Sequence, residues 1–261
     1  MQQGTIATLP DILGRIVERK AEELARRTVP FRELEQRAAQ FARRPFHEAL
    51  NRRLPSIVAE IKKASPSRGV FLENFAPAEL ARKYQAGGAA ALSVLTDQDF
   101  FQGSLQDLET ARAATTLPVL RKDFTTAEYH VAEAAAHGAD AILLIAAILD
   151  GHQLRAFRQL AASFGMAALV EVHDEHELES ALTTGAEIIG VNNRDLRTFE
   201  VRLEISHRLG ALIPPGVLRV AESGIFTRAH IRELSHFQAF LVGESLMRAP
   251  DAAAEIRSLC S

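Results

Sequence analysis

Polar side chains stand at the carboxyl ends of several short apolar runs in this sequence: Glu60 and Lys62, Lys122, Glu171, Asn192, and Glu222. The runs are typical of buried parallel strands, in which side chains alternate between two faces. In each run an apolar residue comes first, and the polar residue follows on the same face. Two ammonium groups and three carboxylates around one pocket would suit general acid–base catalysis, because unlike charges keep each other ionised and oriented. A lone lysine at a strand end is as readily a solvated edge residue, so the prediction depends on these ends meeting.

Two turns that contain glycine and serine indicate an anion site. Ser223 and Gly224 follow one apolar run, and Gly243 and Glu244 follow the last, just before a short expected helix over Leu246–Arg248. Glycine lets the backbone approach a ligand closely, and free N–H groups at the start of a helix attract phosphate. Ordinary strand-to-helix turns use the same residues, so the phosphate prediction requires that both loops face one pocket.

Eight apolar runs alternate with segments of helical period, which indicates a parallel sheet. The runs are Ser56–Lys62, Ala90–Leu95, Pro118–Lys122, Ala141–Ile145, Ala167–Val172, Ile188–Asn192, Leu218–Glu222 and Ala239–Val242. Eight units predict an α/β fold, a (β/α)₈ TIM barrel over residues 55–250. A six-stranded open sheet remains the alternative, although no run is followed by the Gly-x-Gly-x-x-Gly dinucleotide motif.

Residues 1–50 have a different character, with apolar residues at helical spacing among many Arg, Glu and Gln. We expect two or three amphipathic helices, separated at Pro30 and Pro45, that pack on the barrel as an extension. The many acidic residues argue against a transit peptide. Without a clear linker, residues 1–261 are interpreted as one domain.

The composition narrows the possible function classes. The 261 residues carry a formal net charge of −3, which argues against sequence-independent binding of nucleic acid. The single cysteine, Cys260, allows no internal disulfide, and the sequence shows neither a signal peptide nor a membrane span. We therefore expect a cytoplasmic protein, monomer or homodimer, with no membrane partner. No metal or other cofactor is expected, since His173 and His176 near Glu171 lack the spacing of a zinc motif.

A polar segment and an aromatic pair add further candidates for binding. Ser65 and Ser67 lie in the polar loop Lys62–Gly69 and are able to donate hydrogen bonds to an anion. Phe100 and Phe101 follow the second run. At a pocket mouth they would cover an aromatic ring, and packing in the core is an equally good interpretation.

The strand-end motifs resemble those of indole-3-glycerol-phosphate synthases in type, order and spacing. They are Ala59–Ser67, Leu120–Phe124, Leu169–Val172, Gly190–Leu196, Ala221–Ile225 and Val242–Met247. The resemblance extends from about Pro55 to Pro250 and includes the helical extension. The paired Glu60 and Lys62 are its most specific feature, whereas the last two motifs occur in many phosphate-binding barrels.

The resemblance implies a substrate, a reaction and a role for each residue. The enzyme would be a carboxy-lyase that converts 1-(2-carboxyphenylamino)-1-deoxyribulose 5-phosphate to indole-3-glycerol phosphate in tryptophan biosynthesis. Lys122 would protonate the ketone, and Lys62 and Glu171 would serve the later dehydration as acid and base, with Glu60 sharing protons. The substrate and the lysines would be oriented by Asn192 and Glu222. Ser65, Phe101 and Arg194 would bind the anthranilate end, and Ser223, Gly224, Gly243 and Glu244 the phosphate.

Two rival functions remain at this point. A phosphoribosylanthranilate isomerase would need a cysteine or carboxylate base at a strand end, and the only cysteine is the penultimate residue. The Glu60 and Lys62 pair would also have no role there. A regulatory barrel that only binds a phosphorylated ligand would not require two lysines and a glutamate as proton donors and acceptor.

Overall fold

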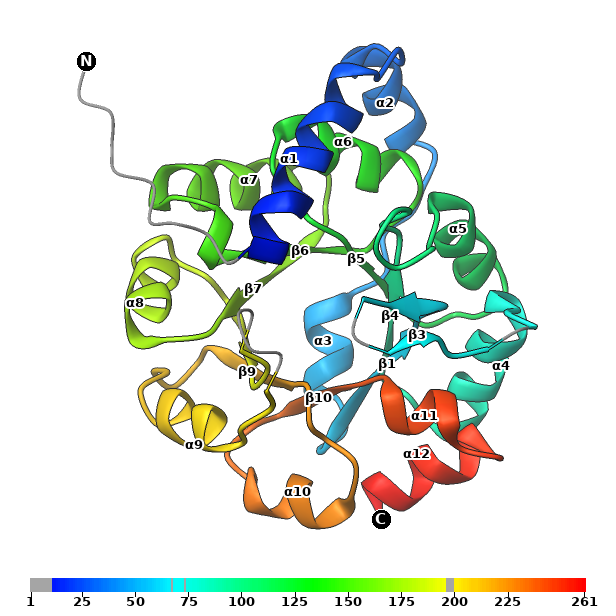
Figure 1. The fold of residues 1–261 in the computed structure, drawn as a ribbon, viewed down its shortest axis with the longest axis vertical. Helices are drawn as coiled ribbons and strands as arrows, with labels where there is room; N and C mark the ends of the chain where they lie inside the picture. Colours follow the sequence, from blue (N-terminus) through cyan, green and yellow to red (C-terminus); the bar gives the residue numbers. More distant parts are fainter. Residues whose placement is uncertain (1–10, 67, 73, 196–199) are drawn as a thin grey trace.

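A computed structural model describes residues 11–66, 68–72, 74–195 and 200–261, and its centre is a closed barrel of eight parallel strands (Figure 1). The strands are β1 (Ser56–Ile61), β4 (Ala91–Leu95), β5 (Val119–Lys122), β6 (Ala141–Ile145), β7 (Ala167–Val172), β8 (Ile188–Asn192), β9 (Leu218–Glu222) and β10 (Ala239–Val242). They pair in chain order, and β10 pairs with β1 to close the ring. The predicted TIM barrel is confirmed, and the open sheet is wrong.

Helices surround the barrel between successive strands. They are α4 (Pro77–Gly87), α5 (Leu105–Ala113), α6 (Glu128–Ala136), the 3₁₀ helix η1 (Ala146–Ile148), α7 (Gly151–Ser163), α8 (Glu175–Thr183), α9 (Glu204–Gly210), α10 (Arg228–Glu233), α11 (Glu244–Arg248) and α12 (Ala252–Cys260). Side-chain caps fix several starts, since the Ser104 and Asp174 side chains accept a backbone N–H at the start of α5 and α8. None of the described helices is long and apolar enough to cross a bilayer.

Two expected segments differ in detail from the structure. The helix expected over Leu246–Arg248 begins earlier, at Glu244, directly after Gly243. The segment expected as a polar loop contains a short antiparallel pair, β2 (Ala64–Ser65) and β3 (Gly69–Val70). Backbone pairing over two residues produces no recognisable period in a sequence, so side-chain pattern alone does not reveal it.

Alternation along the strands separates two layers of core. In β1, Ile57 and Ala59 belong to the apolar layer between the strands and the helices. Val58 packs inside the barrel with Leu120 and Leu169 of other strands. Because side chains alternate with period two, the next inward position of β1 is Glu60. The barrel interior is therefore apolar at mid-strand and becomes charged toward the carboxyl ends of the strands.

The amino-terminal segment forms three helices, α1 (Asp11–Ala25), α2 (Phe31–Ala38) and α3 (Phe46–Asn51). Pro30 and Pro45 immediately precede α2 and α3, as the sequence predicts. In Figure 1, α3 is seen within the ring of strands, where Phe46 and Leu50 pack against the interior residues of the barrel. This helix closes the amino-terminal end of the barrel.

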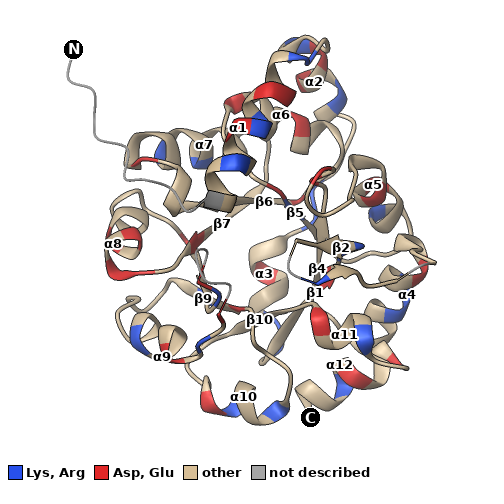
Figure 2. Cartoon of the chain, in the orientation of Figure 1, with Lys and Arg blue, Asp and Glu red and all other residues tan. Residues whose placement is uncertain are grey.

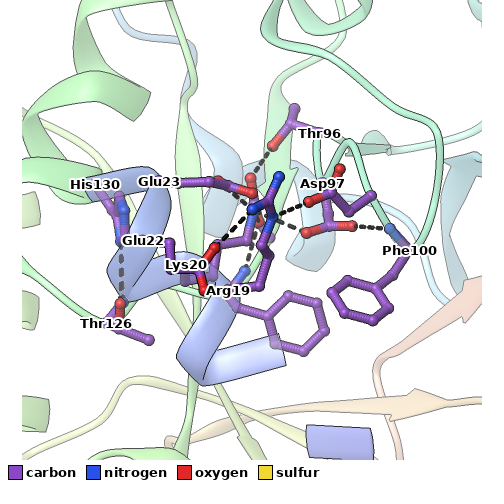
Figure 3. Close-up of polar contacts among 12 residues, drawn as sticks. Arg19, Lys20, Glu22, Glu23, Thr96, Asp97, Phe100, Thr126 and His130 are labelled. Atoms are coloured by element: carbon purple, nitrogen blue, oxygen red, sulfur yellow. Dashed lines mark hydrogen bonds and ion pairs between the residues drawn. The ribbon is translucent and has the colours of Figure 1, made fainter. Parts of the chain in front are cut away.

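Helix α1 lies at the opposite end and is attached by a buried ammonium group. The Lys20 side chain is 4% exposed, and its Nζ lies 2.8 Å from Asp97 Oδ2 and 3.0 Å from Asp123 Oδ1 (Figure 3). These aspartates follow β4 and β5, and Asp123 also accepts a hydrogen bond from the Thr96 hydroxyl. Burial lowers the pKa of Lys20, but the two carboxylates outweigh this and raise it above its usual value. The ammonium thus ties α1 to the carboxyl ends of two strands.

Replacing Lys20 by Met should destabilise the protein strongly. The substitution leaves Asp97 and Asp123 buried without the ammonium, and removing one partner of a buried ion pair typically costs about 3–5 kcal/mol. Arg37→Met breaks the exposed pair between Arg37 and Glu33 and should cost less than about 1 kcal/mol. Urea unfolding of both variants measures the difference. Equal losses would show that the buried pair contributes no more than the exposed one.

Candidate active site

A pocket opens at the carboxyl ends of the barrel strands, beneath α1. Most residues that the sequence singled out for chemistry or binding line it: Glu60, Lys62, Ser65, Phe101, Lys122, Glu171, Asn192, Arg194, Ser223, Gly224, Gly243 and Glu244. Phe100, the other member of the aromatic pair, does not line this pocket. Glu222 is buried at the end of β9 and contacts Lys122. Ser67 and Leu196, which belong to the motifs of the sequence analysis, lie outside the described residues. In Figure 2, acidic and basic segments meet around the strand ends where these residues lie.

Lys122 of β5 stands between two carboxylates, one from β7 and one from β9. Its Nζ donates a hydrogen bond to Glu171 Oε2 at 3.1 Å and lies 3.7 Å from Glu222 Oε2. Burial alone would lower the pKa of Lys122, but the charges of Glu171 and Glu222 raise it well above its usual range. Lys122 is therefore protonated at neutral pH and is able to donate a proton.

Glu171 and Glu222 have opposite protonation states although both are buried. For Glu171, burial favours the neutral acid, but Lys122 and His173 outweigh it and hold the pKa well below its usual range. For Glu222, burial and then the charge of Glu171 raise the pKa to about 8, and Lys122 opposes them only in part. At neutral pH, Glu171 is thus ionised and Glu222 carries a proton.

A second lysine–glutamate pair comes from β1 and the segment after it. The Lys62 ammonium forms an ion pair with the Glu60 carboxylate, two residues earlier on the same face. The same Nζ lies 5.4 Å from the centroid of the Phe71 ring, which is a distance that favours a cation–π contact. The pocket therefore has two separate ammonium groups, each with its own carboxylate partner.

Two glycines make room for the carboxylates. A Cβ atom on Gly190 in β8 would lie 2.1 Å from Glu222 Oε1, and one on Gly243 would lie 2.1 Å from Glu60 Oε2. Any larger residue would displace the carboxyl group. Gly243 was expected to serve a phosphate through its backbone, so its steric role toward Glu60 was not foreseen. Gly190 was predicted only as the first residue of the Gly190–Leu196 motif. Its steric role was not foreseen, because only the folded barrel brings β8 beside Glu222.

The loops after β9 and β10 face the pocket together, as the phosphate prediction requires. Ser223 and Gly224 both have positive φ, 65° and 78°, and Gly243 precedes α11. A left-handed conformation is uncommon for a serine and marks a backbone shaped by its surroundings. Both loops line the same pocket.

The opposite side of the pocket is apolar and aromatic. The rings of Phe101 and Phe124 lie 6.2 Å apart, and Phe101 lines the pocket rather than only filling the core. Ile12, Leu13 and Ile16 of α1 complete this side. None of the α1 residues was predicted to belong to the site. Their helical spacing was visible, but an apolar stripe does not show what it packs against.

Comparisons with known proteins agree on one family. The sequence model of a family described as "Indole-3-glycerol phosphate synthase" matches residues 13–259. A curated relative of that name from Burkholderia vietnamiensis is 47% identical over 95% of this chain and 98% of its own length. Another of that name, from a Roseiflexus species, is 50% identical over 95% of this chain and 97% of its own length.

Solved structures of lower identity share the fold. A thiamine phosphate pyrophosphorylase from Pyrococcus furiosus superposes with a TM-score of 0.57 at 18% identity and covers 79% of this chain and 93% of its own. The structure titled KGPDC from Streptococcus mutans superposes with a TM-score of 0.61 at 13% identity. It covers 79% of this chain and 96% of its own. At such identities the likeness concerns the barrel alone.

Glu222→Gln should change how stability depends on pH. The pKa of Glu222 is raised from about 4.5 when unfolded to about 8 when folded, so its stabilisation is complete below pH 4.5 and is lost as pH rises through 8. Glutamine does not ionise. The free energy of unfolding of the variant should therefore rise relative to that of the parent protein between pH 5 and 8, by at most about 1.4 kcal/mol per pH unit. Urea unfolding across this range measures it. Parallel curves would show that Glu222 is ionised in the folded protein.

Proposed function

The chain belongs to the indole-3-glycerol phosphate synthase family, and we propose that the two lysines and the carboxylates of its pocket divide the proton transfers of that reaction. The enzyme is a carboxy-lyase of tryptophan biosynthesis. It closes the indole ring of 1-(2-carboxyphenylamino)-1-deoxyribulose 5-phosphate, with loss of carbon dioxide and water, to form indole-3-glycerol phosphate. Both rival functions, the isomerase and the regulatory barrel, are thereby wrong.

In the proposed pose the substrate spans the pocket between its two unlike sides. The phosphate accepts hydrogen bonds from backbone N–H groups of Ser223, Gly224, Gly243 and Glu244, whose two loops line one pocket. The anthranilate ring lies against Phe101, with its carboxylate toward Ser65 and Arg194. Holding both ends folds the chain of the substrate, so that its ring carbon lies near the ketone.

The first chemical step in this proposal uses Lys122 as the acid. As the ring carbon that bears the carboxylate attacks the ketone carbon, the Lys122 ammonium protonates the ketone oxygen. This role of Lys122 is supported by the position of its Nζ between Glu171 and Glu222, whose charges keep the amine protonated before the reaction. General acid catalysis of this kind contributes about 10²–10⁴-fold.

Decarboxylation then follows from the chemistry of the cyclised substrate. Ring attack destroys aromaticity and leaves an iminium group, which accepts the electron pair of the breaking carbon–carbon bond as carbon dioxide departs. The substrate therefore supplies its own electron sink. For this step the protein need only hold the ring in place and exclude water.

The later dehydration is assigned to Lys62 and Glu171. The Lys62 ammonium protonates the departing hydroxyl group, which leaves as water. The ionised Glu171 accepts a proton from the neighbouring ring CH2 group, and its loss forms the carbon–carbon double bond of the five-membered indole ring. Glu60 pairs with Lys62 and returns a proton to it. Glu171 suits a base because its pKa is held low by Lys122 and His173.

In this proposal Glu222 and Asn192 orient the reacting side chains and do not react themselves. The neutral Glu222 carboxyl group is able to donate a hydrogen bond, and its contact with Lys122 fixes that ammonium. Asn192 forms a hydrogen bond to Glu171, and its Oδ1 accepts the backbone N–H of Arg194 at 3.0 Å. We further propose that the chain acts as one barrel domain in the cytoplasm, as a monomer or homodimer without a nucleic-acid partner.

Lys122→Ala should abolish turnover while the barrel stays folded. The purified parent protein mixed with the carboxyphenylamino deoxyribulose phosphate should develop indole fluorescence, and the variant should lose at least about 10²-fold of that rate. Circular dichroism checks that the variant is folded. Near-normal turnover by the variant would remove Lys122 from the mechanism. Absence of product with the parent protein would contradict the activity itself.

Glu171→Gln should slow dehydration more than ring closure. Glutamine keeps the shape of the side chain but accepts no proton, so a cyclised, decarboxylated intermediate should accumulate. Rapid quenching and mass spectrometry distinguish it from substrate by the loss of carbon dioxide. If only substrate accumulates, Glu171 acts before or during ring closure, and its proposed role is wrong.

A further inference from the structure

His173 lies directly behind the pocket and has a carboxylate beside each of its ring nitrogens. Its Nδ1 lies 2.9 Å from Glu177 Oε2, and the same oxygen accepts the backbone N–H of His173 at 2.8 Å. Its Nε2 lies 3.3 Å from Glu171 Oε1. The side chain is only 12% exposed. The ring therefore bridges a carboxylate outside the pocket and the carboxylate inside it.

Glu177 is itself fixed by the start of α8. It lies in the first turn of this helix, and its backbone N–H donates to the Asp174 side chain at 2.8 Å. The side chain of Glu177 returns toward the end of β7 and meets both the backbone and the ring of His173. The cap of α8 thus places the carboxylate that orients the imidazole.

The two oxygens of Glu171 face different cations. Oε2 accepts a hydrogen bond from Lys122, and Oε1 faces His173. A carboxylate held at both oxygens has a fixed plane and a defined direction toward the pocket. We propose that His173, held by Glu177, is a positioning residue that keeps Glu171 ionised and correctly oriented as the proton acceptor. This inference rests on the proposed role of Glu171 as the base.

The charges around the pair are consistent with an imidazolium ion. His173 is faced by Glu171 and Glu177. Burial lowers its pKa, but the two neighbouring carboxylates outweigh this and raise it to about 10. Glu171 is faced by Lys122 from β5, by His173, and by Glu222 from β9. The positive charge of His173 is therefore present throughout the neutral pH range.

A comparison with Glu222 shows what the second cation achieves. Both carboxyl groups are buried and both contact Lys122. Glu171 has His173 as a second cation and stays ionised, whereas Glu222 has no second cation among its ion pairs with described residues and has its pKa raised to about 8. Since one ammonium does not keep two buried carboxylates ionised, His173 decides which of them is the base.

The protonation state of His173 is directly measurable. With ¹⁵N-labelled imidazoles, NMR at about pH 8 should show a doubly protonated ring for His173, well above the ordinary histidine pKa of about 6.5. His176, an exposed histidine three residues away in the first turn of α8, serves as the comparison. In Glu171→Gln the pKa of His173 should fall. A neutral His173 ring at this pH in the parent protein would overturn the inference.

Kinetics then test the effect on the base. His173→Asn should lower kcat by about 10- to 100-fold, the size expected when a reacting group is misplaced by a fraction of an ångström to 1 Å. KM should stay within about twofold, since His173 does not line the pocket. The acid limb of the kcat profile should move up by about one to three pH units, because Glu171 loses a nearby cation.

Matched variants keep the result interpretable. His176→Asn removes an exposed histidine three residues away and should leave kcat unchanged. Glu177→Gln weakens the contact that orients the His173 ring and should move the acid limb of the kcat profile in the same direction by a smaller amount. This variant tests the proposal if His173→Asn fails to fold. Equal kcat and equal pH profiles for the His173 and His176 variants would refute the positioning role. If Glu171→Gln also retains full turnover, the proposed function of Glu171 fails instead.

Discussion

The carboxyl-terminal end of this barrel depends on one constraint, the removal of several ionisable groups from water at the same place. An ionised carboxylate in an apolar interior is costly unless cations and hydrogen bonds replace its solvent. Glu171 has Lys122 and His173 and stays charged, and Glu222 shares Lys122 and takes up a proton instead. The protonation states of the two glutamates therefore differ because of the number of cations within reach and not because of residue type.

The strand register makes this arrangement possible. Glu171 of β7 is paired with Gly190 of β8, and Gly190 is paired in turn with Val220 of β9. Without a side chain at Gly190, the Glu222 carboxyl group leans across β8 toward Lys122 and Glu171. A methyl group there would push Glu222 away from both, so a residue with no chemistry of its own controls the electrostatics of the site.

Much of the barrel was predictable from the sequence because its strands are short, apolar and regularly spaced. β7 and β8 begin and end at the predicted residues, and the inward direction of Glu60, Lys122 and Glu171 follows from period-two alternation. Features that arise from contacts between distant segments were not predictable. The α1 helix over the pocket, the room at Gly190 and the bridging position of His173 belong to this class. Each depends on which segments become neighbours after the chain has folded, and no local pattern records that.

The attachment of α1 shows how a directional contact complements an apolar one. Leu13 and Ile16 pack at the pocket, but hydrophobic burial is non-directional and tolerates sliding of a helix along its groove. Lys20 lies one turn beyond Ile16, and its ammonium accepts only a narrow range of positions between Asp97 and Asp123. Asp97 also accepts the backbone N–H of Phe101, and Asp123 that of Phe124, so the ammonium joins both aromatic loops to the helix. A buried ion pair adds little net stability over an apolar replacement. We therefore infer that its contribution here is geometric: it fixes the distance between the apolar face of α1 and the charged side chains at the strand ends.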